Sequence, residues 1–116
     1  MKAKLIALSL IVAAAAVAQV VIPLGSPTGT FEWEPNPEPD IAGYRLYYGT
    51  TSGTHPTMFD VGNITTATLP FPNTGTFYIV ATAYNTSALE SLPSDELVAT
   101  ITMKPSKVTS LRQTGP

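Results

Sequence analysis

The sequence predicts an all-β protein, a seven-stranded antiparallel sandwich of two sheets. From Gln19 onward, short apolar stretches alternate with turn signals at intervals of about 8–12 residues. The 11 prolines and 8 glycines favour many turns over long helices. The connections are too short for parallel crossovers, so neighbouring strands are expected to run antiparallel. A chain of 116 residues has room for one such domain after a short leader.

The leader, residues 1–18, is predicted to be a helical signal peptide. Two lysines begin it, and an apolar run over residues 5–17 follows that only one serine interrupts. The triplet Ala16-Val17-Ala18 has small residues where signal peptidase requires them, so cleavage is expected directly after it. The run is shorter than the ~20 apolar residues that cross a membrane. Because residues 20–24 are also apolar, a retained membrane anchor is the alternative.

Seven strands are expected after the leader. They cover residues 20–24, 30–34, 43–49, 58–61, 64–69, 76–84 and 95–103. In the second strand, Phe31 and Trp33 point to one side and the two glutamates point to the other. Three prolines at alternate positions then make residues 35–39 a stiff loop, because proline donates no hydrogen bond to a neighbouring strand.

The same alternation assigns the buried faces of the later strands. Residues 43–49 place three apolar side chains on one face, and residues 76–84 form the longest expected strand. Turns are expected over residues 50–56 and 70–75, and a long loop over residues 85–94. The predicted core is Phe31, Trp33, Tyr44, Leu46, Tyr48, Leu69, Phe77 and Ile79.

An ordered series of short motifs connects these strands to a known family. The series is Trp33, GYRLYYGTTSG at 43–53, DVG at 60–62, Leu69, FYIVATAYN at 77–85, and E-S-x-P-S at 90–94. It resembles the fibronectin type III family, in the form common in bacterial and phage proteins. The resemblance implies an immunoglobulin-like sandwich over residues 19–103, with recognition carried by end loops and exposed strand faces.

Two positions depart from the family pattern. Phe77 stands where the family usually has the tyrosine of the tyrosine corner, and the missing hydroxyl cannot make its hydrogen bond to the backbone. We expect a stability about 1 kcal/mol lower than with that hydrogen bond. Ala88 stands where the family often has glycine in its final loop, so a different conformation is expected for this loop.

Charge divides the chain into an acidic domain and a basic tail. Between Gln19 and Met103 the sequence has eight acidic side chains and one basic side chain, Arg45. A domain this acidic is a poor match for nucleic acid or an anionic membrane, so neither is an expected partner. Residues 104–116 contain three basic side chains and no acidic one. We expect a polar, flexible and solvated tail there, with contact to an anionic surface as the alternative.

The residues form no recognisable catalytic or metal site. Without cysteine, the chain has no thiol nucleophile, disulfide or thiolate metal site. His55, the only histidine, lies in a turn and is expected to be solvated. Glu32 and Glu34 fit an outward acidic face better than a glycosidase pair, and the spacing of Glu38 and Asp40 matches no known calcium loop. We therefore expect no enzyme activity, no cofactor and no bound metal.

Two surfaces are candidates for contact with a partner, either a protein or a carbohydrate. One is a set of three tyrosines predicted to face outward, which suit sugar and protein contacts alike but also stabilise sheets as cross-strand pairs. The other is the loop over residues 86–92, whose two leucines mark a contact if exposed and are structural if they pack against the sheet edge. The candidate contact residues are Tyr47, Tyr78, Tyr84, Leu89, Glu90 and Leu92.

These observations predict an exported, non-catalytic binding or display module that is secreted, periplasmic or at a cell surface. The alternative is a structural or decoration protein of a phage particle, located in the virion, because the family is frequent there. A cleavable signal counts against assembly in the cytoplasm. A more remote alternative is an accessory module of a polysaccharide-acting system. No stable membrane span is expected once the signal is removed.

Overall fold

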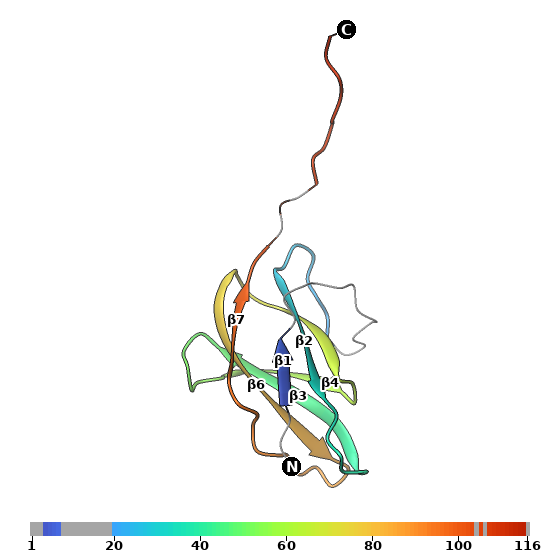
Figure 1. Cartoon of the computed structure of the whole chain (residues 1–116), viewed down its shortest axis with the longest axis vertical. Coiled ribbons are helices and arrows are strands. Elements are labelled where there is room, and N and C mark those ends of the chain that lie inside the picture. The colour runs from blue at the N-terminus through green and yellow to red at the C-terminus, as the bar shows by residue number, and fades with distance from the viewer. Residues whose placement is uncertain (1–3, 8–19, 104, 106, 116) are drawn as a thin grey trace.

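A computed structural model describes residues 4–7, 20–103, 105 and 107–115, which form a two-layer β-sandwich with a projecting tail (Figure 1). The described residues contain seven strands and no helix. The strands are β1 (Lys4–Ala7), β2 (Thr28–Glu34), β3 (Ile41–Gly49), β4 (Thr57–Gly62), β5 (Thr66–Pro70), β6 (Gly75–Asn85) and β7 (Leu97–Ile101).

The strands form two antiparallel sheets. A three-stranded sheet has the order β1-β2-β5, and a four-stranded sheet has the order β4-β3-β6-β7. All neighbouring strands within the sheets run antiparallel. The chain crosses between the layers after β4, where Gly62 has a φ of 76° that favours glycine. The predicted fold class, an all-β antiparallel sandwich of two sheets, is therefore confirmed. The strand count differs, because six strands rather than seven lie in the described residues after the predicted leader.

The core lies between the two sheets and is built from alternate residues of the facing strands. On β2, Phe31 and Trp33 are buried whereas Glu34 is exposed, as the alternation predicted. Most of the predicted core is fully buried, namely Phe31, Trp33, Tyr44, Leu46, Leu69, Phe77 and Ile79. The hydroxyl of buried Tyr44 accepts a hydrogen bond of 2.8 Å from the backbone N–H of Asn36, which fixes the proline-rich loop. Tyr48 is only partly buried.

Phe71 belongs to the core although it lies in a predicted turn. Its side chain is 2% exposed, and its ring centroid lies 4.8 Å from that of Phe77 and 4.9 Å from that of Tyr48. The N–H of Phe71 donates to the carbonyl of Pro27, which holds this turn against the start of β2. Phe71 follows β5 directly and lies outside any strand, so alternation along a strand carried no signal for it.

The first strand does not lie where the sequence predicted it. Residues 20–24 were expected to form this strand, but the chain turns at Leu24 and Gly25, the latter with a φ of 82°. The edge of β2 is occupied by β1, which pairs Lys4–Ala7 with residues 34 to 31. Residues 20–24 therefore have no free edge there to join, and Pro23 lacks an N–H for such a pairing.

β1 lies within the predicted helical signal peptide. The four described residues of that segment are extended, which corrects the helix expected for them. Antiparallel pairing with β2 satisfies the backbone groups that a helix would otherwise have paired internally. Residues 1–3 and 8–19 lie outside the described residues, so the cleavable signal stays a prediction.

The chain leaves the sandwich after β7. β7 covers Leu97–Ile101, which is shorter than the strand predicted over residues 95–103. The described residues that follow project away from the two sheets (Figure 1). Val108 and Leu111 in this segment are 78% and 89% exposed. The segment is the one expected to form a basic tail.

Candidate functional site on the four-stranded sheet

The candidate site lies on the surface of the four-stranded sheet that points away from the core, which we call the outer face. Because side chains alternate along a strand, β3 directs Arg45 and Tyr47 to this face while their neighbours enter the core. β6 contributes Thr82 and Tyr84, and β4 contributes Asp60. Arg45 is paired with both Asp60 and Thr82 in the strand register, so these side chains meet in a row.

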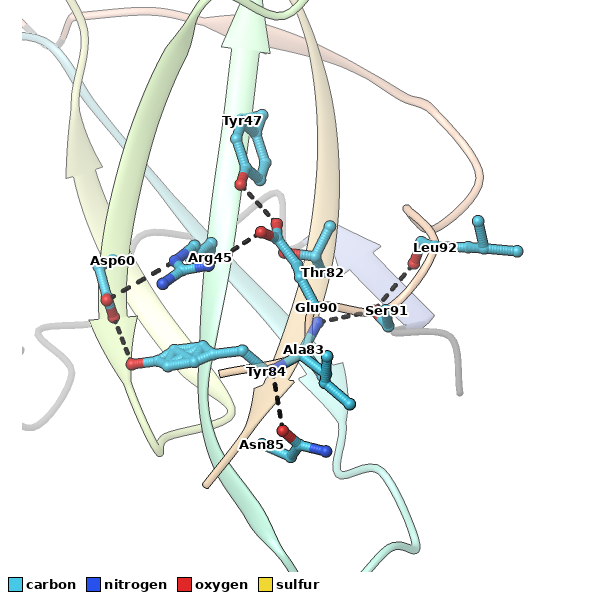
Figure 2. Close-up of polar contacts among 11 residues, drawn as sticks. Arg45, Tyr47, Asp60, Thr82, Ala83, Tyr84, Asn85, Glu90, Ser91 and Leu92 are labelled. Atoms are coloured by element: carbon cyan, nitrogen blue, oxygen red, sulfur yellow. Dashed lines mark hydrogen bonds and ion pairs between the residues drawn. The ribbon is translucent and has the colours of Figure 1, made fainter. Parts of the chain in front are cut away.

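Glu90 is the centre of a hydrogen-bond network on the outer face (Figure 2). It comes from the loop after β6 and receives a hydrogen bond of 2.9 Å from Arg45 Nη1. Its second oxygen, Oε2, accepts hydrogen bonds from the hydroxyls of Tyr47, at 2.5 Å, and Thr82, at 2.7 Å. Three donors from two strands therefore hold one loop carboxylate against the sheet.

Arg45 connects this network to Tyr84 and Asp60. Its guanidinium carbon lies 4.2 Å from the centre of the Tyr84 ring, a cation–π contact. The Tyr84 hydroxyl donates a 2.9 Å hydrogen bond to Asp60 Oδ1, and Arg45 Nε lies 3.8 Å from Asp60 Oδ2. The Tyr84 ring also lies so close to Gly43 that a Cβ atom there would be 2.5 Å from the ring carbon Cζ. A side chain at this position would therefore displace the Tyr84 ring.

The protonation states in the network are fixed at neutral pH. Burial alone would raise the pKa of Glu90, but donated hydrogen bonds, led by that of Tyr47, outweigh burial and lower this pKa below its usual 4.5. Burial and the hydrogen bond to Glu90 raise the pKa of Tyr47. Burial and the hydrogen bond to Asp60 raise the pKa of Tyr84. Glu90 is therefore a charged acceptor, and both tyrosines are neutral donors.

Hydroxyl groups attach the loop after β6 to the sheet. Ser91 Oγ accepts a hydrogen bond from the N–H of Ala83, and Ser94 Oγ accepts one from the N–H of Ala81, both at 2.9 Å. The N–H groups of Ser91 and Ser94 donate to the carbonyls of the same two alanines. The serines thus take the place of a neighbouring strand beside β6, which explains the E-S-x-P-S motif physically.

The turn at the start of this loop includes Ala88. This residue has a φ of 62°, the left-handed conformation that glycine favours. The different loop conformation expected from the absence of glycine stays a prediction. Asn85 stabilises the turn, because its side-chain oxygen accepts hydrogen bonds from the N–H groups of Ser87 and Leu89. Leu89 and Leu92 consequently project from a well-anchored loop and are 64% and 75% exposed.

His55 is not the solvated loop residue that the sequence predicted. Its ring atom Nε2 lies 2.7 Å from Glu96 Oε2, and its side chain is only 17% exposed. The hydroxyl of Ser52 and the N–H of Gly53 also donate to Glu96, and these hydrogen bonds lower the pKa of Glu96. Ser52 bonds to the carboxylate rather than to the imidazole, so the cluster lacks the serine–histidine contact of a nucleophilic triad. It ties the β3–β4 loop to the start of β7.

An open pocket of about 300 Å³ lies between the loop after β6 and the β3–β4 loop. Tyr47, Thr82, Glu90 and His55 form part of its wall, and the wall is completed by Val80, Ser91 and Pro93. Among the described residues, no group of three or more histidine or acidic side chains is arranged to hold a metal ion. No helix of the described residues could span a membrane.

The structure separates the six predicted contact residues into three sets. Tyr47, Tyr84 and Glu90 meet around Arg45, a residue that the sequence did not single out for a site. The only signal for Arg45 was its status as the sole basic residue of an acidic domain. Tyr78 lies farther along β6, opposite Gly49 and Val98 and away from this network. Leu89 and Leu92 flank Glu90 and Ser91 on the exposed loop.

Comparisons with known proteins identify the fold. No protein-family model matches the chain, and no curated protein matches its sequence. Solved structures do match, among them an Fn3-like protein from Clostridium thermocellum, with 25% identity and a TM-score of 0.53 over 66% of this chain and 79% of that one. The chain has a fibronectin type III-like fold. The resemblance drawn from the motifs is therefore confirmed.

A second solved structure with a similar fold belongs to a longer chain. The structure of the chicken CNTN1 FN1–FN3 domains aligns with 74% of this chain at 25% identity and a TM-score of 0.56, and the alignment covers 30% of that longer chain. Fibronectin type III-like domains commonly serve as binding or scaffolding modules. Because a fold of this kind hosts many roles, the role of this domain must be argued from its outer face and its loops.

Proposed function

We propose that the chain is an exported, non-catalytic binding module that contacts a partner protein at a cell surface. The observation that carries this proposal is the pair Leu89 and Leu92, two apolar side chains more than 60% exposed on an anchored loop. Exposed apolar residues beside polar ones mark interaction sites in soluble proteins. A loop already held in one conformation loses little entropy on binding, which favours affinity.

A protein partner suits this surface better than a carbohydrate. Sugar binding by stacking needs an open aromatic ring face. The ring of Tyr84 is covered by the guanidinium of Arg45 and lies close to the backbone at Gly43, so it offers no such face. The Tyr47 hydroxyl already donates its proton to Glu90, so it has no proton left to donate to a sugar. Leu89 and Leu92 supply apolar contact area, which contributes more to protein association than to sugar recognition.

A direct test compares loop variants. Leu89→Ser/Leu92→Ser removes the proposed contact without touching the network, and Met103→Ser is the matched control because it alters another exposed apolar residue, 52% exposed, beyond β7. We expect a host-envelope partner, once captured and purified, to bind the loop variant at least about tenfold more weakly than the control. Equal affinities for both variants would refute the leucine contact.

The export part of the proposal has its own test. N-terminal sequencing of protein from the producing cells should give Gln19 as the first residue, as the leader composition predicts. Material that begins at Met1 would overturn export by cleavage and favour assembly into a virion. The result does not depend on the loop variants, so the two parts of the proposal succeed or fail separately.

A further inference from the structure

The pocket on the outer face offers hydrogen-bond acceptors and few free donors. The hydroxyls of Tyr47 and Thr82 both donate their protons to Glu90, and the hydroxyl of Ser91 donates to the carbonyl of Leu92. When a neutral His55 ring donates from Nε2 to Glu96, its other ring nitrogen is an acceptor. What the wall offers to a ligand is therefore hydroxyl, carboxylate and imidazole lone pairs, which suit a ligand rich in N–H donors.

The charge around the pocket is negative. Arg45 is the only basic side chain between Gln19 and Met103, and it is shared by Asp60 and Glu90. Glu96 lies beside the pocket on the far side of His55. Two carboxylates therefore share one guanidinium, and a third carboxylate lies beside His55. The surplus of acidic side chains near the pocket favours a cation. Val80 and Pro93 in the same wall suit the aliphatic stem that carries the charge of lysine or arginine.

The chain itself contains a segment of this chemistry. The tail beyond β7 has no acidic side chain and includes Lys107 and Arg112, with Val108 and Leu111 between them. Both apolar residues are largely exposed, at 78% and 89%. Figure 1 shows the described part of the tail directed away from its own sandwich.

We propose that the pocket on the outer face binds the basic tail of a second copy of the chain, so that copies associate tail to sandwich. Lys107 or Arg112 enters the pocket and donates to Glu90 and the hydroxyl oxygens, while Val108 and Leu111 contact the apolar surface of Leu89 and Leu92. Such a contact is heterologous, joining different surfaces of the two copies, so it produces chains or rings rather than a closed symmetric dimer. The inference goes beyond the proposed function and does not require export.

The first experiment is sedimentation of the full chain from micromolar to millimolar concentration. Lys107→Glu/Arg112→Glu is the comparison, and both residues lie in the exposed tail, so the variant leaves the sandwich intact. We expect the sedimentation coefficient of the natural chain to rise with concentration and that of the variant to stay constant. Concentration-independent values for both proteins would overturn the proposal, and so would compaction of the natural chain without association, because the tail would then bind its own sandwich.

The second experiment locates the contact. A synthetic peptide of residues 105–115 is titrated into the full-length tail variant, whose own tail cannot compete. We expect amide resonances of Tyr47, Thr82 and Glu90 to shift, and a peptide with glutamine in place of both basic residues to bind about tenfold more weakly. Binding that shifts other residues, or equal binding of both peptides, would overturn the assignment of the pocket. The leucine variant removes only the apolar part of the tail contact and leaves the pocket lining and the basic tail residues unchanged. Resonance shifts of Tyr47, Thr82 and Glu90 therefore test the tail proposal separately from the partner protein.

Discussion

Replacement of Gly43 by alanine tests the contact between Arg45 and the Tyr84 ring most directly. A Cβ atom at this position would lie 2.5 Å from Tyr84 Cζ and 2.8 Å from Cε1, well inside van der Waals contact. The Tyr84 ring must therefore move. Its movement breaks the hydrogen bond to Asp60 and the contact with Arg45. An exposed cation–π contact contributes about 0.5–1 kcal/mol, and a hydrogen bond to a charged group about 1.5 kcal/mol at the low end.

We therefore expect Gly43→Ala to lower the free energy of unfolding by about 2 kcal/mol. The measurement is chemical denaturation followed by the fluorescence of Trp33, which lies in the core. The backbone at Gly43 is not in the left-handed region, so alanine itself is tolerated there.

The decisive control is the same substitution in a Tyr84→Ala background. Removal of the ring takes away the three atoms nearest to the added methyl group. Alanine in a strand is about 0.5–1 kcal/mol better than glycine. The effect of Gly43→Ala should then change sign, from destabilising to neutral or stabilising. An equal loss of stability in both backgrounds would show that the ring contact is not the cause.

Three further outcomes are expected from the network and the loop. Because the pKa of Glu90 is lowered in the folded state, its contribution to stability is complete above its usual 4.5 and is lost as the pH falls through the folded value. The free energy of unfolding of Glu90→Gln should therefore fall less steeply as the pH drops below 4.5, and an unchanged profile would contradict the network. Ala88→Gly should raise the free energy of unfolding by about 0.5–1 kcal/mol, since it relieves a left-handed alanine at the cost of chain entropy; a lower thermal midpoint would argue against strain at Ala88. Ser94→Ala should lower the free energy of unfolding by about 1–3 kcal/mol, because the N–H of Ala81 loses its acceptor. Amide exchange at Ala81 should become faster, and unchanged exchange would show that Ser94 does not protect this N–H.

The fold could be predicted because each strand carries its own local signal. Alternation placed Phe31 and Trp33 in the core, and turn residues separated the strands at a spacing typical of sandwiches. Phe71 was not predicted as a core residue because it lies in a turn and is buried by contacts with other aromatic rings. β1 was not predicted as a strand because the composition of its segment indicates a leader, and its pairing with β2 depends on residues far away in the sequence.

The candidate site was predictable only in part. Outward tyrosines and an apolar loop can be found from strand phase and composition. The meeting of Arg45 with Glu90 depends on the register of β3 and on the path of the loop, 45 residues later in the chain. His55 illustrates the same limit, because a turn sequence carries no sign that Glu96, 41 residues away, will approach it. Contacts between distant segments are set by packing, which local pattern does not encode.

The proposed removal of the leader would change the edge of the three-stranded sheet, because β1 forms that edge. While the leader is attached, backbone groups of residues 31–34 are paired with Lys4–Ala7. Removal of the leader would expose these N–H and C=O groups along one side of β2. An open strand edge of this kind pairs readily with other extended chains. The chain with β1 in place is therefore shielded from edge-to-edge pairing along this side of β2, whereas a chain without it would have a second, backbone-mediated means of joining its neighbours.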